Sequence, residues 1–210
     1  LEQLLDRVYV VDDGSTDGSA QSVDDLGATV VTFPQNRGKG FAMLAGFEAA
    51  LQEPEVEAVA ILDADGQHDP KELPHLYQVF VEQDADLLIG SRTFQRGETP
   101  WASWLGNSLT AFLTGLLLRQ DIPDTQSGYR IHSRRFLEDV LETVPGGRYE
   151  TEMAILLKAA REDYRLVSEP IQTIYEEGNR SSHFNKVRDS VRIYRTFFKA
   201  AFRRIKPKPH

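Results

Sequence analysis

Residues 58–70 read AVAILDADGQHDP, an apolar run that ends in acids, a glycine and a proline. The first five residues predict a short buried strand, and Pro70 starts a helix that reaches Gln83. Similar patterns extend over the first 90 residues, with strands predicted at 7–11, 28–33, 58–62 and 86–89 and helices at 16–26, 40–52 and 70–83. This alternation predicts an α/β fold with a mostly parallel sheet flanked by helices.

The second half of the chain has a less regular pattern. It predicts helices at 101–119, 134–143 and 149–162, strands at 129–132, 165–168 and 171–175, and a polar turn at 121–128. A chain of 210 residues is long enough for one domain with a buried core. We therefore expect one domain over residues 1–183, a helix over 184–205 and a disordered tail over 206–210.

Composition excludes several classes of protein and of site. The chain has 40% hydrophobic and 27% charged residues, which is typical of a folded globular protein and excludes disordered and collagen-like classes. It contains no cysteine, so disulfide scaffolds, thiolate zinc sites and cysteine nucleophiles are excluded. No run of 18 apolar residues is present, so the sequence predicts no membrane-spanning helix.

The formal net charge of −8 is unevenly distributed along the chain. Residues 186–210 contain nine Lys or Arg and one acid, a net charge of +8, so residues 1–185 carry −16. The acidic body argues against nucleic acid as a partner, whereas the basic end suits an anionic membrane surface.

Within residues 186–205, apolar side chains recur every three or four positions and cations lie largely to either side. This pattern predicts an amphipathic helix that lies on a membrane without crossing it. The protein would then be cytoplasmic and held peripherally at the cytoplasmic face of a membrane. The alternative is that this helix packs on its own domain or forms a homodimer interface.

Three loops should lie together, because ligands of parallel α/β sheets bind beyond the carboxyl ends of the strands. These are the loops that follow residues 11, 62 and 89. The first contains Asp12 and Asp13, which either form an ordinary turn or accept hydrogen bonds from a nucleobase or a ribose.

The loop after residue 62 has the oxygen ligands of a metal site. Asp63, Asp65 and the amide oxygen of Gln67 suit a hard divalent cation that keeps positions open for phosphate oxygens. A calcium-binding EF-hand is excluded, since His68 and Pro74 stand where it needs Gly and Glu. The alternative is a solvated acidic turn.

Residues 36–40 read NRGKG, a basic, glycine-rich segment before a helix. A P-loop is excluded by Phe33 and Gly40, and the dinucleotide-binding pattern is excluded by Met43 in its third glycine position. Gly38 and Lys39 can still approach a nucleotide, or the segment is only the first turn of the helix.

Five ordered motifs together resemble family 2 glycosyltransferases. They are VVDDGSTD at 10–17, NRGKG at 36–40, LDADGQHDP at 62–70, GSR at 90–92 and DTQSGYR at 124–130. Within that family the chain looks like dolichol-phosphate mannosyltransferases and bacterial polyprenyl-phosphate glycosyltransferases, over residues 8 to about 175. The resemblance implies the GT-A nucleotide-diphospho-sugar transferase fold. It also implies a hexosyltransferase that transfers sugar with inversion from a UDP- or GDP-sugar, with Mg²⁺ or Mn²⁺.

The same resemblance implies roles for individual residues. The nucleotide would be bound by residues of the first and third motifs, namely Val11, Asp13, Asp63 and Ala64. The metal would be held by Asp65 and Gln67. Arg92 would reach the diphosphate or the acceptor phosphate, with Ser127 and Arg130 near the acceptor.

Members of this family open with a further strand and a Pro-x-Tyr-Asn-Glu-like loop, and nothing before Leu1 supplies them. We therefore expect a GT-A fold that lacks its first strand, in an N-terminally truncated piece.

The expected chemistry follows from charge. Sugar transfer leaves a nucleoside diphosphate, whose developing charge a divalent ion stabilises. A polyprenyl phosphate acceptor is already anionic and needs no base, and the guanidinium groups of Arg92 and Arg130 suit it. A hydroxyl acceptor would need a base, for which Asp124 is the candidate. A nucleotidyltransferase and an inactive nucleotide-sugar-binding domain remain as alternatives.

Overall fold

The computed structural model describes residues 7–18, 23, 27–92, 124–148, 150–162 and 164–172. Several predicted elements lie wholly or partly outside these residues: the helices at 16–26, 101–119 and 184–205, the end of the strand at 171–175, and the tail at 206–210. In the described part of the chain, no helix is long and apolar enough to cross a membrane.

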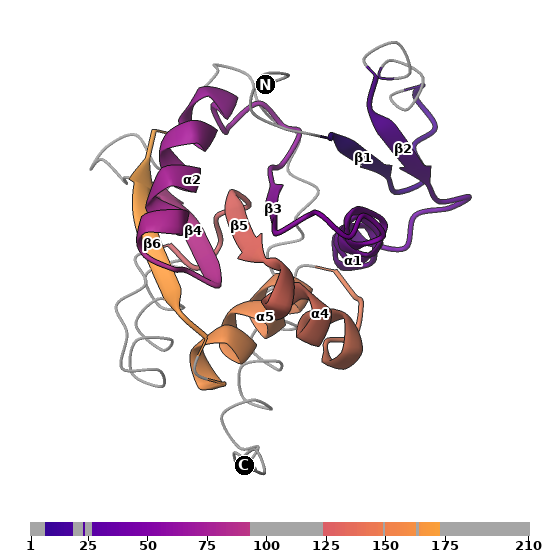
Figure 1. Ribbon diagram of the computed structural model, residues 1–210. Coiled ribbons are helices and arrows are strands. Elements are labelled where there is room, and N and C mark those ends of the chain that lie inside the picture. The colour runs from indigo at the N-terminus through magenta and orange to yellow at the C-terminus, as the bar shows by residue number, and fades with distance from the viewer. Residues whose placement is uncertain are drawn as a thin grey trace, which may run out of the picture.

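The described strands form two sheets (Figure 1). One is a parallel pair of β1 with β2, and the other has four strands in the order β3-β5-β4-β6. Among the described strands, β1 pairs only with β2 and β3 only with β5. The bounds are β1 Tyr9–Asp12, β2 Thr29–Thr32, β3 Ala58–Ile61, β4 Leu87–Arg92, β5 Arg130–Ser133 and β6 Leu166–Ile171.

The strands run mostly in one direction, as expected, and β5 is the exception among the described strands. β5 runs antiparallel to β3 and to β4, whereas β4 and β6 are parallel, so the four-stranded sheet is mixed. Arg130, the first residue of β5, pairs with Ile61 at the end of β3 and with Ile89 of β4. Because β5 begins at this edge, residues 124–129 lie near the carboxyl ends of the strands, where ligand sites of α/β sheets are found.

One correction concerns the last strands. The sequence predicts two of them, at 165–168 and 171–175, but the described residues 164–172 form one strand, β6, which continues through Pro170. β6 is the last strand in the order of its sheet and pairs with β4. Proline is tolerated on such an edge, because its missing N–H is not needed by a second neighbour.

The helices lie close to their predicted positions, and local capping explains several boundaries. The Asp69 side chain accepts a hydrogen bond from the Lys71 amide at 2.9 Å, and Ser133 Oγ accepts one from the Phe136 amide at 3.3 Å. The helices are α1 Lys39–Leu51, the 3₁₀ turn η2 Pro70–Glu72, α2 Leu73–Glu82, α4 Arg134–Thr143 and α5 Glu150–Arg161.

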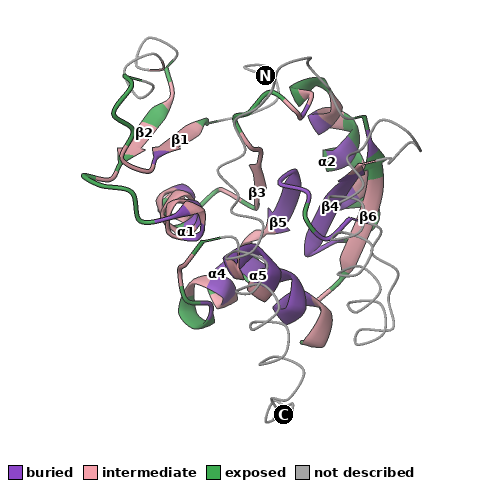
Figure 2. Ribbon diagram, turned by 180° about the vertical axis from the view of Figure 1, so that it is seen from behind, coloured by how far each residue is buried: buried purple, intermediate pink, exposed green. Residues whose placement is uncertain are grey.

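Both faces of the four-stranded sheet are covered. Leu87 and Ile89 of β4 pack in one apolar cluster with residues of α1, α4 and α5, whereas Leu88 packs in another with residues of α2. This alternation is expected of a strand buried on both faces. Figure 2 shows β4 and β5 buried between these helices.

Asp86, directly before β4, is a buried carboxylate held by three partners. It accepts hydrogen bonds from the Arg135 guanidinium, from Ser133 Oγ at 2.8 Å and from the Arg165 amide at 2.9 Å. Burial alone would raise the pKa of Asp86, but these hydrogen bonds outweigh it and lower the pKa below its ordinary value.

We expect Asp86→Asn to lower the free energy of unfolding at neutral pH by about 1–3 kcal/mol. Since the pKa of Asp86 is lower in the folded chain, its contribution is present above the ordinary aspartate pKa of about 3.9 and is lost as the pH falls through the folded value. The difference in the free energy of unfolding between wild type and Asp86→Asn should therefore shrink when denaturation is measured at lower pH. Asp84→Asn, at an exposed carboxylate two positions away, is the control. A difference that stays constant with pH would contradict the prediction.

Candidate functional site

The loop after β1 is organised by its own acids. Asp12 accepts a hydrogen bond from the Ser15 amide at 2.9 Å. The two oxygens of Asp13 accept from the amides of Arg37 at 2.7 Å and Gly38 at 2.8 Å. Asp13 therefore joins this loop to the segment before α1, and its contact with a nucleoside stays a prediction. Val11 is half-buried in β1.

The two glycines at the start of α1 allow close packing against the start of α5 and the turn that precedes it. Gly38 has a φ of 110°, and a Cβ there would lie 2.8 Å from the Gly147 carbonyl oxygen. A Cβ on Gly40 would lie 2.1 Å from Thr151 Oγ1. Gly38 thus has a structural role, beside any approach to a nucleotide.

Lys39, between these glycines, joins α1 to the loop after β3 and to α5. Its Nζ lies 2.7 Å from Asp63 Oδ1, 2.9 Å from Asp63 Oδ2 and 3.1 Å from Glu152 Oε1. Burial lowers the pKa of Lys39, but the carboxylates of Glu152 and Asp63 outweigh burial and raise it above its ordinary value. Lys39 is therefore a cation beside the first acid of the loop that follows β3.

Glu152 was missed by the sequence analysis. It lies in the first turn of α5, where acids are common because they suit the helix dipole. No local signal distinguishes it from Glu150.

Asp65, the second acid of the loop after β3, is exposed, as is Ala64. Asp65 Oδ1 accepts a hydrogen bond from the Gln67 amide at 3.0 Å, which brings these two residues together in one turn. In the part of the chain that the structure describes, no three acids or histidines are grouped to hold a metal ion. Asp65 and Gln67 fit a hard cation that takes its other ligands from water and phosphate, as Mg²⁺ commonly does.

His68 directly follows Gln67 in the chain and is only 7% exposed. Its ring lies 5.4 Å from the ring of Tyr129, and its buried Nδ1 has no hydrogen-bond partner in the described part of the chain. Burial lowers the pKa of His68, and the charges of Asp63 and Asp65 only partly offset this. The imidazole is therefore an uncharged group beside the acids.

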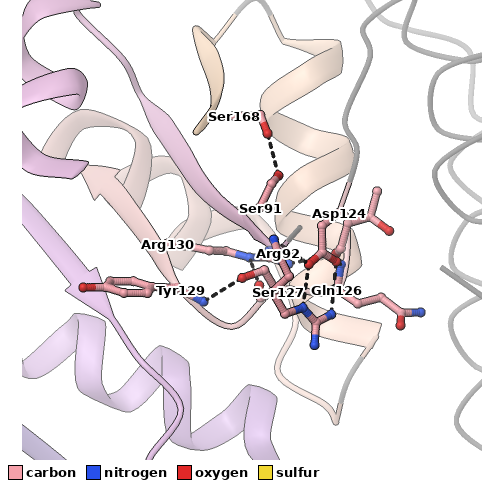
Figure 3. A network of polar contacts seen from close by, with 9 residues as sticks. Ser91, Arg92, Asp124, Gln126, Ser127, Tyr129, Arg130 and Ser168 are labelled. Atoms are coloured by element: carbon pink, nitrogen blue, oxygen red, sulfur yellow. Dashed lines mark hydrogen bonds and ion pairs between the residues drawn. The ribbon is translucent and has the colours of Figure 1, made fainter. Parts of the chain in front are cut away.

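Arg92, at the end of β4, is held by Asp124 (Figure 3). Arg92 Nε donates to Asp124 Oδ2 at 2.6 Å and Arg92 Nη2 donates to Asp124 Oδ1 at 3.1 Å. Asp124 is fully buried, whereas 20% of the Arg92 side chain is exposed. This geometry makes Asp124 an anchor for the guanidinium, a setting unlike that of an accessible base.

Arg130 is placed differently from the expectation that it meets an acceptor phosphate. It is 1% exposed, and its guanidinium donates to the carbonyl oxygens of Ser127 at 2.9 Å, Thr125 at 3.0 Å and Glu152 at 3.1 Å. Its side chain is thus used to hold the loop 124–130 against α5.

Ser127 is also fully buried, and its Oγ accepts from the Tyr129 amide at 3.3 Å (Figure 3). The loop reaches the acids after β3 at Gly128, where an added Cβ would lie 2.2 Å from Asp63 Oδ2. The structure therefore brings Lys39, Asp63 and the loop 124–130 together.

Comparison with known sequences matches residues 1–141 to the family described as glycosyl transferase family 2. A polyprenol monophosphomannose synthase of Mycolicibacterium smegmatis is 33% identical over 179 residues, which cover 79% of this chain and 65% of that protein. An undecaprenyl-phosphate mannosyltransferase of Micrococcus luteus is 30% identical over 183 residues, which cover 81% and 72%. A UDP-N-acetylglucosamine–dolichyl-phosphate N-acetylglucosaminyltransferase of Methanococcus voltae is 29% identical over 192 residues, covering 82% and 76%.

Among solved structures, the chain is similar to glucosyl-3-phosphoglycerate synthase from Mycobacterium tuberculosis. The complex of that enzyme with phosphoglyceric acid superposes with a TM-score of 0.70 at 19% identity, covering 94% of this chain and 70% of that one. Its complex with Mn²⁺, UDP-glucose and phosphoglyceric acid gives 0.68 at 20% identity, covering 94% and 69%. The likeness confirms the expected GT-A fold.

Proposed function

This chain belongs to glycosyltransferase family 2, and on that basis we propose that it moves a hexose from a UDP- or GDP-sugar to a polyprenyl phosphate. The transfer depends on a metal ion and inverts the configuration at the anomeric carbon of the sugar. The observation that carries the proposal is the meeting of three groups at one edge of the sheet: the acids after β3, Lys39, and the loop 124–130 that holds Arg92.

In this proposal, the nucleotide-sugar donor binds at the loop after β3. Asp65 and Gln67 would hold Mg²⁺ or Mn²⁺, which when bound neutralises charge on the leaving diphosphate. Lys39 keeps a positive charge beside Asp63 in the nucleotide site. Support comes from the solved structure with Mn²⁺ and UDP-glucose, which has the same fold. The nucleoside would lie toward Val11 and Asp13, after β1.

In this proposal, the acceptor phosphate binds at Arg92. Asp124 orients its guanidinium through two hydrogen bonds, and part of the side chain stays exposed. A planar guanidinium suits a phosphate, and an anionic acceptor needs no base. This agrees with the burial of Asp124 and with relatives whose names include polyprenol, undecaprenyl-phosphate and dolichyl-phosphate. Ser127 and Arg130 would shape this side from within the loop.

Residues 184–205 would hold the enzyme at the membrane where such a lipid resides. This segment lies outside the described residues, and the proposal rests on its cations and its apolar periodicity. Each cation near an anionic leaflet contributes about 1 kcal/mol, so several together suffice for peripheral contact.

One assay tests donor, acceptor and membrane contact together. Radiolabelled UDP- and GDP-sugars with Mn²⁺ are offered to the chain with undecaprenyl phosphate, either in anionic liposomes or in detergent micelles. We expect a labelled lipid and released UDP or GDP. A variant with Arg188, Arg192 and Arg195 changed to Gln should lose activity on liposomes about 100-fold, from about 1 kcal/mol per cation, and keep it in detergent.

Other outcomes of this assay overturn parts of the proposal. Released pyrophosphate would indicate a nucleotidyltransferase. A sugar transferred only to hydroxyl compounds would exclude the phosphate acceptor. Equal activity of the triple variant on liposomes would exclude the membrane contact.

A further inference from the structure

Glu152 contacts both sides of the proposed site. Its carboxylate lies 3.1 Å from Lys39 Nζ, and its backbone carbonyl accepts a hydrogen bond from Arg130 Nη1 at 3.1 Å. The Glu152 side chain is only 11% exposed. A carboxylate removed from water in this way is costly unless it is paired, and its partner here is Lys39.

Lys39 has two anions that restrict its side chain, Asp63 and Glu152. Its backbone is fixed, because Gly38 and Gly40 pack closely on the turn before α5. Its flexible side chain would still have about 2 kcal/mol of rotamer entropy to lose on being ordered. Glu152 of α5 and Asp63 of the loop after β3 both contact the ammonium and restrict it to the edge of the sheet.

We propose that Glu152 is a positioning residue for sugar transfer: it holds Lys39 against Asp63, so that one fixed cation lies beside the donor diphosphate. This inference rests on the proposed function, since it concerns the same donor site. Glu152 acts through Lys39 and does not touch the reacting atoms.

The electrostatics predict which kinetic constant changes. Removal of the Glu152 charge makes the site less negative, which does not weaken the binding of an anionic donor. The loss should instead appear in the transfer step, where charge develops on the diphosphate and a fixed cation is most effective. The loop contact should survive, because Arg130 binds the backbone of Glu152 and not its side chain.

The test is Glu152→Gln, which keeps the shape of the side chain and removes its charge. We expect kcat to fall about 10- to 100-fold, as is usual when a residue supporting a site is lost, while the KM for the donor stays within about threefold. Glu152→Asp, which keeps the charge on a shorter side chain, should recover part of kcat.

The matched control is Glu162→Gln, which removes an acid paired with Lys158 just beyond the other end of α5. We expect its kcat and KM to equal those of wild type. A similar loss of kcat in Glu162→Gln would show that the effect is a general one on α5 and would overturn the assignment.

A double-mutant cycle shows whether Glu152 acts through Lys39. Lys39→Met should lower kcat on its own, and the addition of Glu152→Gln to that variant should cost nothing further. Additive losses, wild-type kcat in Glu152→Gln, or a rise in KM alone would each overturn the inference. If wild type itself transfers no sugar with any UDP- or GDP-sugar, the proposed function fails, and this inference with it.

Discussion

Asp65→Asn is expected to abolish metal-dependent sugar transfer and to leave the fold intact. Asp65 is exposed, and it accepts a hydrogen bond from the Gln67 amide, which an Asn side-chain oxygen can also accept. The substitution therefore keeps this hydrogen bond and removes the charge that would bind the cation. A metal ion contributes several kcal/mol to stabilising the charge of a transition state, so we expect kcat to fall at least about 1000-fold.

The measurement is labelled-sugar transfer across a Mn²⁺ titration, together with thermal unfolding. Asp69→Asn is the matched control, because Asp69 lies in the same loop and caps η2 through the Lys71 amide, a role that Asn also fills. It should behave like wild type. Near-normal activity of Asp65→Asn at saturating Mn²⁺ would refute the assignment of Asp65 as metal ligand.

Arg92→Met is expected to reduce both stability and activity. The substitution leaves the carboxylate of Asp124 fully buried without its guanidinium partner. Removal of one partner of a buried ion pair typically costs about 3–5 kcal/mol. For a chain of this size that lowers Tm by about 6–20 °C. Activity should be lost as well, because the cation proposed for the acceptor phosphate is gone.

A double variant separates these two effects. Arg92→Met combined with Asp124→Leu removes both charges, and apolar replacement of a buried pair is often neutral for stability. We expect it to regain much of the lost Tm without regaining sugar transfer. The recovery should be partial, since Asp124 also accepts from the Gln126 amide at 3.1 Å. A fully active double variant would contradict the role of Arg92 in acceptor binding.

Local chemistry explains why the helices and strands were predictable. The bounds of α4, Arg134–Thr143, coincide with the sequence prediction. Ser133 caps the helix, and its apolar residues Phe136, Leu137 and Val140 recur at helical spacing and are buried. These signals lie within a few residues of one another, so they can be read before the fold is known.

The acids after β3, the basic segment 36–40 and the family of the chain were predictable for the same reason. Each depends on residue types at short spacing. The rule for the carboxyl ends of strands predicted only that the loops after residues 11, 62 and 89 lie together, whereas the contact of Lys39 with Asp63 was found in the structure.

The direction of β5 and the roles of the two arginines required the packed chain. Arg92 and Arg130 both belong to motifs that suit phosphate binding, yet Arg130 is enclosed by carbonyl oxygens whereas Arg92 remains partly exposed. Glu152 became a candidate only because α5 brings it to Lys39. Burial, strand direction and ion pairing arise between segments distant along the chain, and short-range patterns carry no information about which of them meet.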